Sequence, residues 1–132
     1  MTTLSVAEQD ALDRAADAPM LAQVERWAAV NSGTTNLAGL KTVAGMLADG
    51  FAALPGEVRL VDPDPVDHVR ADGTLDTVQR GQHLHVRVRP QAPVQLLLTG
   101  HMDTVFAADH PFQALRWLEP GVLNGPGTAD MK

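Results

Sequence analysis

One imidazole and two carboxylates stand where metal ligands are commonly found in a protein sequence. An apolar run at residues 94–99 ends in Gly100, and His101 and Asp103 follow two residues apart. Neutral imidazole is the usual nitrogen ligand of zinc. A carboxylate two residues on could accept a hydrogen bond from the second ring nitrogen and so fix the histidine tautomer. Asp130, in a glycine-rich turn, could bridge two metal ions, because a carboxylate has two oxygens.

Two bridged ions would favour hydrolytic chemistry. At a separation of about 3.5–4 Å they would share the activation of a water molecule and the polarisation of a carbonyl. The chain has no cysteine, so histidines and carboxylates must supply the ligands. The alternative is structural: His101 and Asp103 would be a loop pair that caps a strand, and Asp130 an ordinary turn residue. A His-x-Asp triplet alone does not separate the two interpretations.

The residues around these positions add a resemblance to a known family. Residues 98–105 (LTGHMDTV) and 125–132 (GPGTADMK) resemble the metal-binding signature of the M20 family of zinc peptidases and amidohydrolases. The residues of these two motifs most resemble those of the glutamate carboxypeptidase-like branch. Residues 30–34 (VNSGT), between two expected helices, resemble the opening of that family. The resemblance covers essentially the whole chain, but only the first part of a typical member.

The resemblance implies a role for each candidate residue. His101 would ligate one zinc ion, Asp103 would orient His101 as the catalytic residue of the pair, and Asp130 would bridge both zinc ions. A cis peptide is implied between Asp130 and Met131. The family also uses a Glu-Glu pair, with one member as general base, a later acidic ligand and a distant histidine. None of these has a counterpart in the 132 residues, and we expect Glu119 to be solvated in a hairpin turn.

The resemblance therefore implies that residues 1–132 are the N-terminal segment of one metallohydrolase catalytic domain, without the dimerisation domain of the family. The complete enzyme would cleave an amide or peptide bond in a small peptide or N-acyl amino acid by metal-activated water. We expect this chain alone to be inactive. One alternative is a truncated, non-catalytic binding or assembly partner, for which a homo-oligomer is one assembly. Another is a whole globular domain in which the motif is fortuitous.

The other histidines are weaker candidates for a site. His83 and His85 share one face of an expected strand with Arg87 and Arg89, and positive charge disfavours a cation there. We interpret that face as solvated surface. His110, in the loop after the first motif, is a candidate for the lining of a substrate cleft.

Hydrophobic periodicity predicts the elements that position these residues. Helices are expected over residues 6–17 with a Ser5–Glu8 capping box, from about Pro19, and from the turn cluster at residues 31–36 to about residue 53. Strands are expected near residues 58–60, over the alternating residues 83–89, and over residues 94–99, which read as a strand covered on both faces. A surface loop is expected at residues 62–81 and a hairpin at residues 112–125. Together they predict an α/β fold, with N-terminal helices packed on a mixed sheet, as in part of a zinc-peptidase-like (phosphorylase/hydrolase-like) catalytic domain.

Composition narrows the class of protein. A chain of 132 residues fits one domain. A net charge of -6 argues against nucleic acid or an anionic membrane as partner. The first residues lack the basic and apolar regions of a secretory signal, and no apolar run approaches the length of a membrane helix. The absence of cysteine fits the cytoplasm, where we expect the protein to reside.

Overall fold

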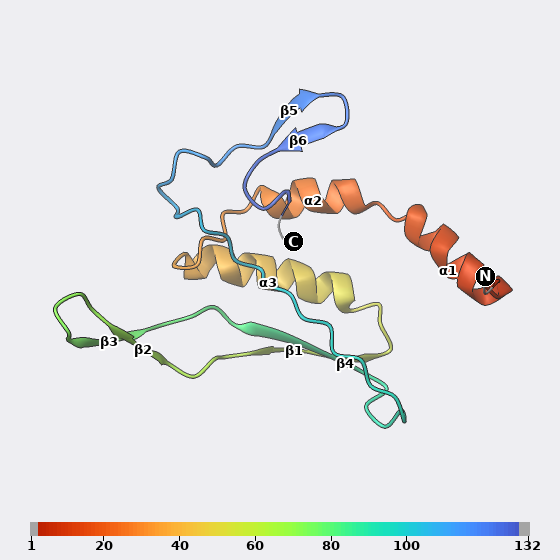
Figure 1. The fold of residues 1–132 in the computed structure, drawn as a ribbon, viewed down its shortest axis with the longest axis horizontal. Helices are drawn as coiled ribbons and strands as arrows, with labels where there is room; N and C mark the ends of the chain where they lie inside the picture. Colours follow the sequence, from red (N-terminus) through yellow and green to blue (C-terminus); the bar gives the residue numbers. More distant parts are fainter. Residues whose placement is uncertain (1–2, 130–132) are drawn as a thin grey trace.

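A computed structural model describes residues 3–129 and has the mixed α/β composition that the sequence predicts. The helices of this described range are α1 (Val6–Ala16), α2 (Met20–Ala28) and α3 (Leu37–Phe51). The strands are β1 (Gly56–Val61), β2 (Val66–Val69), β3 (Leu75–Val78), β4 (His83–Val88), β5 (Arg116–Glu119) and β6 (Val122–Asn124) (Figure 1). No helix in this described part combines the length and the apolar character that crossing a membrane requires.

In the described part of the chain the strands form three small antiparallel sheets and not one mixed sheet. β1 pairs with β4, β2 with β3, and β5 with β6. A parallel contact occurs between Gly33 and Thr104, as an isolated bridge. The prediction of helices packed on a single mixed sheet is therefore wrong for residues 3–129, where each strand pairs with one neighbour.

Helix α1 begins with the predicted capping box. The Ser5 hydroxyl accepts the backbone N–H of Glu8 at 3.3 Å, and the Glu8 carboxylate accepts the backbone N–H of Ser5 at 2.7 Å. These two bonds satisfy donors that a helix start otherwise leaves unpaired. No residue of α1 is buried, and the helix extends away from the other elements (Figure 1). The capping box therefore holds a helix that has little tertiary support.

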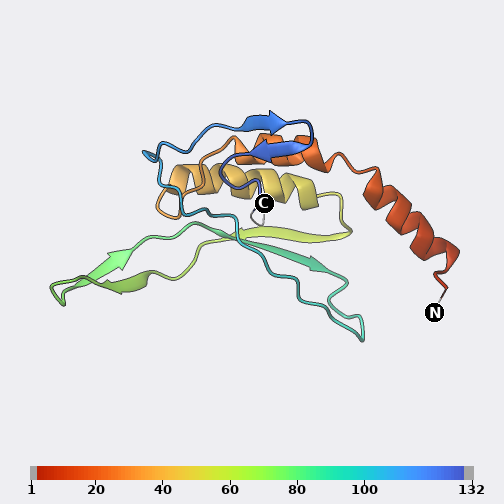
Figure 2. The same cartoon turned by 45° about the horizontal axis from the view of Figure 1, so that its top comes forward.

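Helix α3 covers the β1–β4 sheet. It contacts both strands and runs alongside them in two views (Figures 1 and 2). In β4 the half-buried residues Leu84, Val86 and Val88 alternate with exposed histidines and arginine, as predicted. The period of two places one face of β4 against the helix and the other in solvent.

The most buried residues gather around the first half of α3. Leu40, Val43 and Ala44 of the helix are buried with Ala28 at the end of α2. Two polar residues, Ser32 and Thr104, are buried in the loops near the start of α3, at 0% and 3% exposure. The loop that precedes α3 and the loop that follows residue 103 are therefore part of the core.

The expected loop at residues 62–81 contains a hairpin that the sequence analysis missed. β2 and β3 pair in register around a turn at Asp72 and Gly73, where Gly73 has a φ of 83°. Every residue of β2 is exposed. A hairpin with so little burial shows a weak apolar alternation, which is the signal that sequence reading depends on.

The strand predicted at residues 94–99 is also absent from the described structure. The segment runs as irregular chain from the end of β4 toward the loops near the start of α3 (Figures 1 and 2). Leu96, Leu97 and Leu98 are 87%, 87% and 91% exposed. A strand that is apolar on both faces requires neighbours at its edges and cover on its faces. Within residues 3–129 no strand pairs with this segment and no helix covers it.

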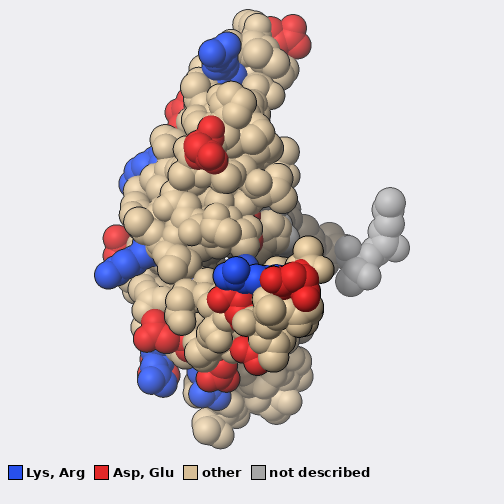
Figure 3. All heavy atoms as spheres, turned by 90° about the vertical axis from the view of Figure 1, so that its left-hand side faces the viewer, with Lys and Arg blue, Asp and Glu red and all other residues tan. Residues whose placement is uncertain are grey.

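Acidic and basic side chains are interspersed on one face of the molecule. In Figure 3, Lys and Arg residues lie among Asp and Glu residues, without a broad patch of one sign on that face.

Candidate metal centre

His101 and Asp103 are hydrogen bonded to each other. The Nδ1 atom of His101 lies 3.2 Å from Oδ1 of Asp103 and 3.0 Å from its backbone oxygen. Both partners are acceptors, so Nδ1 carries the ring proton and the lone pair of the neutral ring is on Nε2. The hydrogen bond expected from the sequence is therefore present, and Nε2 is the atom suited to a metal. The role of His101 as a ligand stays a prediction.

A third residue, Thr34, holds the other oxygen of the Asp103 carboxylate. The Oγ1 atom of Thr34 lies 2.6 Å from Oδ2 of Asp103, in the range of a hydrogen bond to a charged acceptor. Donation from Thr34, and secondarily from His101, lowers the pKa of Asp103 below its ordinary value against an opposing effect of partial burial. Asp103 is thus ionised at neutral pH, as a carboxylate that orients an imidazole should be.

The backbone next to this pair, at residues 32–34 and at Thr104, is part of the core. Thr34 N–H donates to the carbonyl of Thr104 at 3.1 Å, and Thr104 N–H donates to the carbonyl of Ser32 at 2.9 Å. Gly33 lies between them, and a Cβ atom at that position would collide with the backbone oxygen of Phe106. The close approach requires glycine and ties the two loops side by side.

Asn31 connects the same two loops through its side chain. Its Nδ2 atom lies 3.0 Å from the carbonyl oxygen of Phe106 and 2.8 Å from Oε1 of Gln113. Its Oδ1 atom accepts from Nδ2 of Asn36 at 2.9 Å. Asn36 also caps α3, since its Oδ1 accepts the backbone N–H of Gly39 at 3.1 Å. The start of α3 and the segment after Asp103 are therefore parts of one hydrogen-bonded network.

Asp130, the expected bridging ligand, lies outside the described residues, as does its peptide bond with Met131. The turn that leads to it has the glycine-rich form predicted from the sequence. Gly125 and Gly127 are buried, Gly127 has a φ of 76°, and the Thr128 hydroxyl donates to the carbonyl of Gly125 at 2.8 Å. Residues 3–129 bring no third histidine or acid to the pair. The donor set fits one zinc ligand with its orienting carboxylate.

The other candidate residues of the sequence have different surroundings from those of His101 and Asp103. The rings of His83 and His85 stack at 6.3 Å between centroids on an exposed face of β4, as the solvated-surface interpretation expects. Nδ1 of His110 accepts the backbone N–H of Phe112 at 3.0 Å, which engages this ring in its own turn. Glu119 is exposed at the end of β5.

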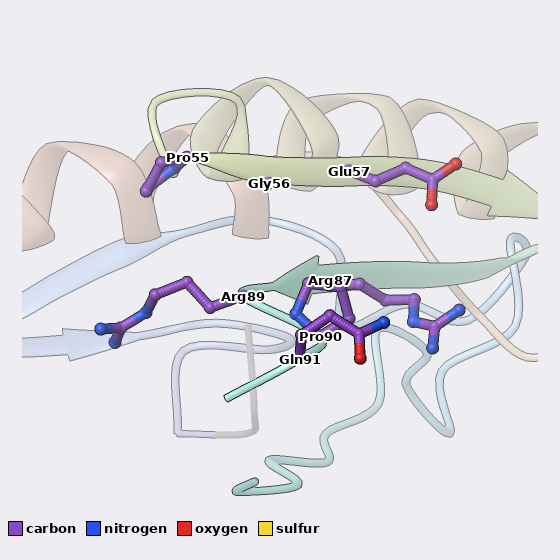
Figure 4. A pocket seen from close by; sticks show the side chains of 7 residues that line it. All are labelled: Pro55, Gly56, Glu57, Arg87, Arg89, Pro90 and Gln91. Carbon is purple, nitrogen blue, oxygen red and sulfur yellow. The ribbon is translucent and has the colours of Figure 1, made fainter. Parts of the chain in front are cut away.

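Two open depressions occur elsewhere on the described surface. The first is lined by Pro55, Gly56, Glu57, Arg87, Arg89, Pro90 and Gln91 (Figure 4). The second is lined by Leu37, Lys41, Asp62, Arg80, Gly81 and Gln82. Neither contains His101 or Asp103. The side chains of the pair are 50% and 36% exposed, so its groups face solvent in the described structure.

Sequence reasoning missed the residues that support the pair. Thr34 and Asp103 are separated by 69 positions, and Asn31 and Gln113 by 82. The turn cluster at residues 31–36 signals the start of a helix, but no local pattern indicates which distant residues it contacts. The resemblance of residues 30–34 to the opening of a metallohydrolase family was the signal that could have drawn attention to Thr34.

Comparison with known proteins adds no family to these observations. The sequence matches no model of a protein family, no curated protein and no solved structure. The observations that bear on function are therefore the two motifs and the geometry of His101, Asp103 and Thr34.

Proposed function

We propose that this chain forms the N-terminal part of the metal centre of a zinc-dependent, M20-like hydrolase that cleaves amide or peptide bonds. The hydrogen bond from His101 Nδ1 to Asp103 carries the proposal, because it selects the tautomer whose Nε2 can ligate a metal. The resemblance of residues 98–105 and 125–132 to the signature of that family supports it and suggests a small peptide or N-acyl amino acid as substrate.

Each of the three residues has a defined task in this proposal. His101 would bind one zinc ion through Nε2, and Asp130 would offer a carboxylate to bridge it to a second. Asp103 keeps its negative charge, because its pKa is lowered, and so favours the proton on Nδ1 of His101. A bound zinc ion would supply a Lewis acid that activates water and polarises the substrate carbonyl.

We also propose that the 132-residue chain by itself does not hydrolyse substrate. Catalysis requires a base within hydrogen-bond reach of the attacking water. No third acid or histidine gathers at the His101–Asp103 pair within residues 3–129, and Glu119 is on an exposed hairpin. The sequence resembles the family only where the first ligands lie, so the base and the remaining ligands would come from elsewhere.

Zinc affinity, measured by competition with a chromophoric chelator at pH 7.5, tests the proposal. We expect weak zinc binding by the chain, which His101→Gln abolishes and the matched control His85→Gln leaves unchanged. We also expect no hydrolysis of N-acyl amino acids or dipeptides with zinc present. Zinc binding that is lost in His85→Gln and kept in His101→Gln would contradict the assignment of the ligand.

A second candidate function is that of a non-catalytic assembly partner. It is favoured by one observation, the exposed apolar segment at residues 94–98, in which Val94, Leu96, Leu97 and Leu98 are each at least 75% exposed. Within residues 3–129 no strand pairs with the backbone of this segment, and its exposed apolar side chains favour the addition of another strand. Concentration-dependent assembly without zinc binding would favour this candidate over the hydrolase.

A further inference from the structure

We propose that Thr34 is a positioning residue of this metal centre, which acts on the zinc ligand through Asp103. Its hydroxyl holds one oxygen of the Asp103 carboxylate and thereby leaves the other for His101. The inference rests on the proposed function and assigns a task to a residue that the two motifs do not include.

The carboxylate of Asp103 is divided between two donors. Thr34 Oγ1 lies 2.6 Å from Oδ2, and His101 Nδ1 lies 3.2 Å from Oδ1. Thr34 Oγ1 is also 3.3 Å from the carbonyl oxygen of Thr104. A hydroxyl has one proton, and the shorter contact with a charged acceptor is the stronger one. Thr34 therefore donates its proton to Asp103. This bond fixes the orientation of the Asp103 carboxylate through Oδ2, the oxygen that the His101 contact does not use.

Thr34 is itself held in place before any metal binds. Its backbone N–H donates to the carbonyl of Thr104, in the bridge beside the buried Ser32. A β-branched side chain has few χ1 rotamers, so a fixed backbone also restricts its hydroxyl. The network of Asn31 and Asn36 anchors the same loop to the start of α3. A donor on so rigid a support keeps the carboxylate in one orientation.

Loss of the Thr34 hydroxyl should weaken the preference of His101 for one tautomer. Without that donor, Asp103 can rotate and turn both oxygens to water, because its side chain is partly exposed. Nδ1 of His101 would then keep only the uncharged backbone oxygen of Asp103, at 3.0 Å, as its acceptor, and the form with a lone pair on Nε2 would be less populated. Residues that orient metal-binding histidines affect affinity by about 10–100-fold, and we expect roughly 10-fold for this more remote one.

The test compares Thr34→Val, which keeps the shape and removes the donor, with Thr34→Ser, which keeps the hydroxyl. Thr42→Val is the matched control, since the Thr42 hydroxyl donates to the Ala38 carbonyl at 3.0 Å within α3. Two quantities are measured on the full chain: the His101 tautomer without metal, from ¹⁵N-detected imidazole spectra, and the dissociation constant for zinc. Thr34→Val should mix the tautomers and weaken zinc binding by about 10-fold. Thr34→Ser and Thr42→Val should resemble the wild type in both.

An unchanged His101 tautomer in Thr34→Val would overturn the inference, as would equal effects of Thr34→Val and Thr42→Val. If Thr34→Val fails to fold, Thr34→Cys takes its place, because a thiol is a weak donor of similar size, and an intermediate tautomer mixture is expected. The tautomer is read without metal, so this outcome is separate from the proposed function. Failure of the wild type to bind zinc would overturn the metal centre and leave the positioning of His101 by Thr34 to be decided by the spectra.

Discussion

Asn31 and Gln113, which are 82 positions apart in the sequence, are joined by a hydrogen bond of 2.8 Å between Nδ2 and Oε1. Asn31 also reaches the carbonyl of Phe106, and its Oδ1 accepts from Asn36. One amide therefore connects the loop before α3, the segment after Asp103 and the approach to β5. The candidate site lies on the part of the chain that these bonds hold together.

Asn31→Ala should destabilise the protein by about 1–3 kcal/mol, because partly buried donors and acceptors lose their partner. The free energy of unfolding in urea measures the effect. Gln9→Ala is the control, since Gln9 makes one exposed hydrogen bond to Asp13, and its loss should stay within about 0.5 kcal/mol. Similar losses in the two variants would show that the Asn31 network does not hold the loops.

Two glycines of α3 should respond to alanine in opposite directions. Gly45→Ala should stabilise by about 0.5–1 kcal/mol, because nothing lies within 4 Å of the added Cβ and alanine favours a helix. Gly39→Ala should destabilise by about 1–3 kcal/mol, because the Cβ would collide with the backbone oxygen of Asn31. Thermal or urea unfolding of the pair distinguishes these signs. Stabilisation by Gly39→Ala would contradict the close packing of α3 on the loop.

Helix α1 should fray in acid. Hydrogen bonds from Ser5 lower the pKa of Glu8 below its ordinary 4.5. A lowered pKa in the folded state stabilises the helix fully above pH 4.5, and this contribution is lost as the pH falls through the lowered value. Amide chemical shifts of α1 during an acid titration measure the helix population. Glu8→Gln, whose amide does not titrate, should remove this pH dependence, and an unchanged titration in that variant would contradict Glu8 of the capping box as its cause.

The apolar segment at residues 94–98 should drive self-association. Light scattering of the wild type should show a mass that rises with concentration, because large exposed apolar patches favour association. Leu97→Lys, at a site that is 87% exposed, should reduce the rise. Val69→Lys changes a residue that is 63% exposed on β2 and should leave it unchanged. A wild-type mass near 14.1 kDa at all concentrations would contradict this role of the segment.

Local signals in the sequence were sufficient for the elements that local interactions determine. The capping box of Ser5 and Glu8, the alternation of β4 and the turn between β5 and β6 each depend on a few neighbouring residues, and the structure has all of them. Residues 94–99 show the opposite case. Their composition predicts a covered strand, but a strand also needs partners, and none is present within residues 3–129.

The candidate site likewise contains one local contact that the sequence predicts and one long-range contact that it does not. The contact between His101 and Asp103 could be predicted, because two residues of separation place the groups within reach of one another. Thr34 could not be assigned to it from the sequence, because its approach depends on the bridge between Gly33 and Thr104. Pairing between distant segments depends on the folded core. It produces no hydrophobic periodicity near the residues that it brings together.

The most direct measurement is a zinc titration of the full chain in which ¹⁵N-detected imidazole spectra follow each of the five histidines. We expect the Nε2 signal of His101 to move first while its Nδ1 stays protonated, and His83 and His85 to respond only at higher zinc. Signals of His101 that stay constant at millimolar zinc, or that move no earlier than those of His83 and His85, would contradict a metal centre at His101 and Asp103.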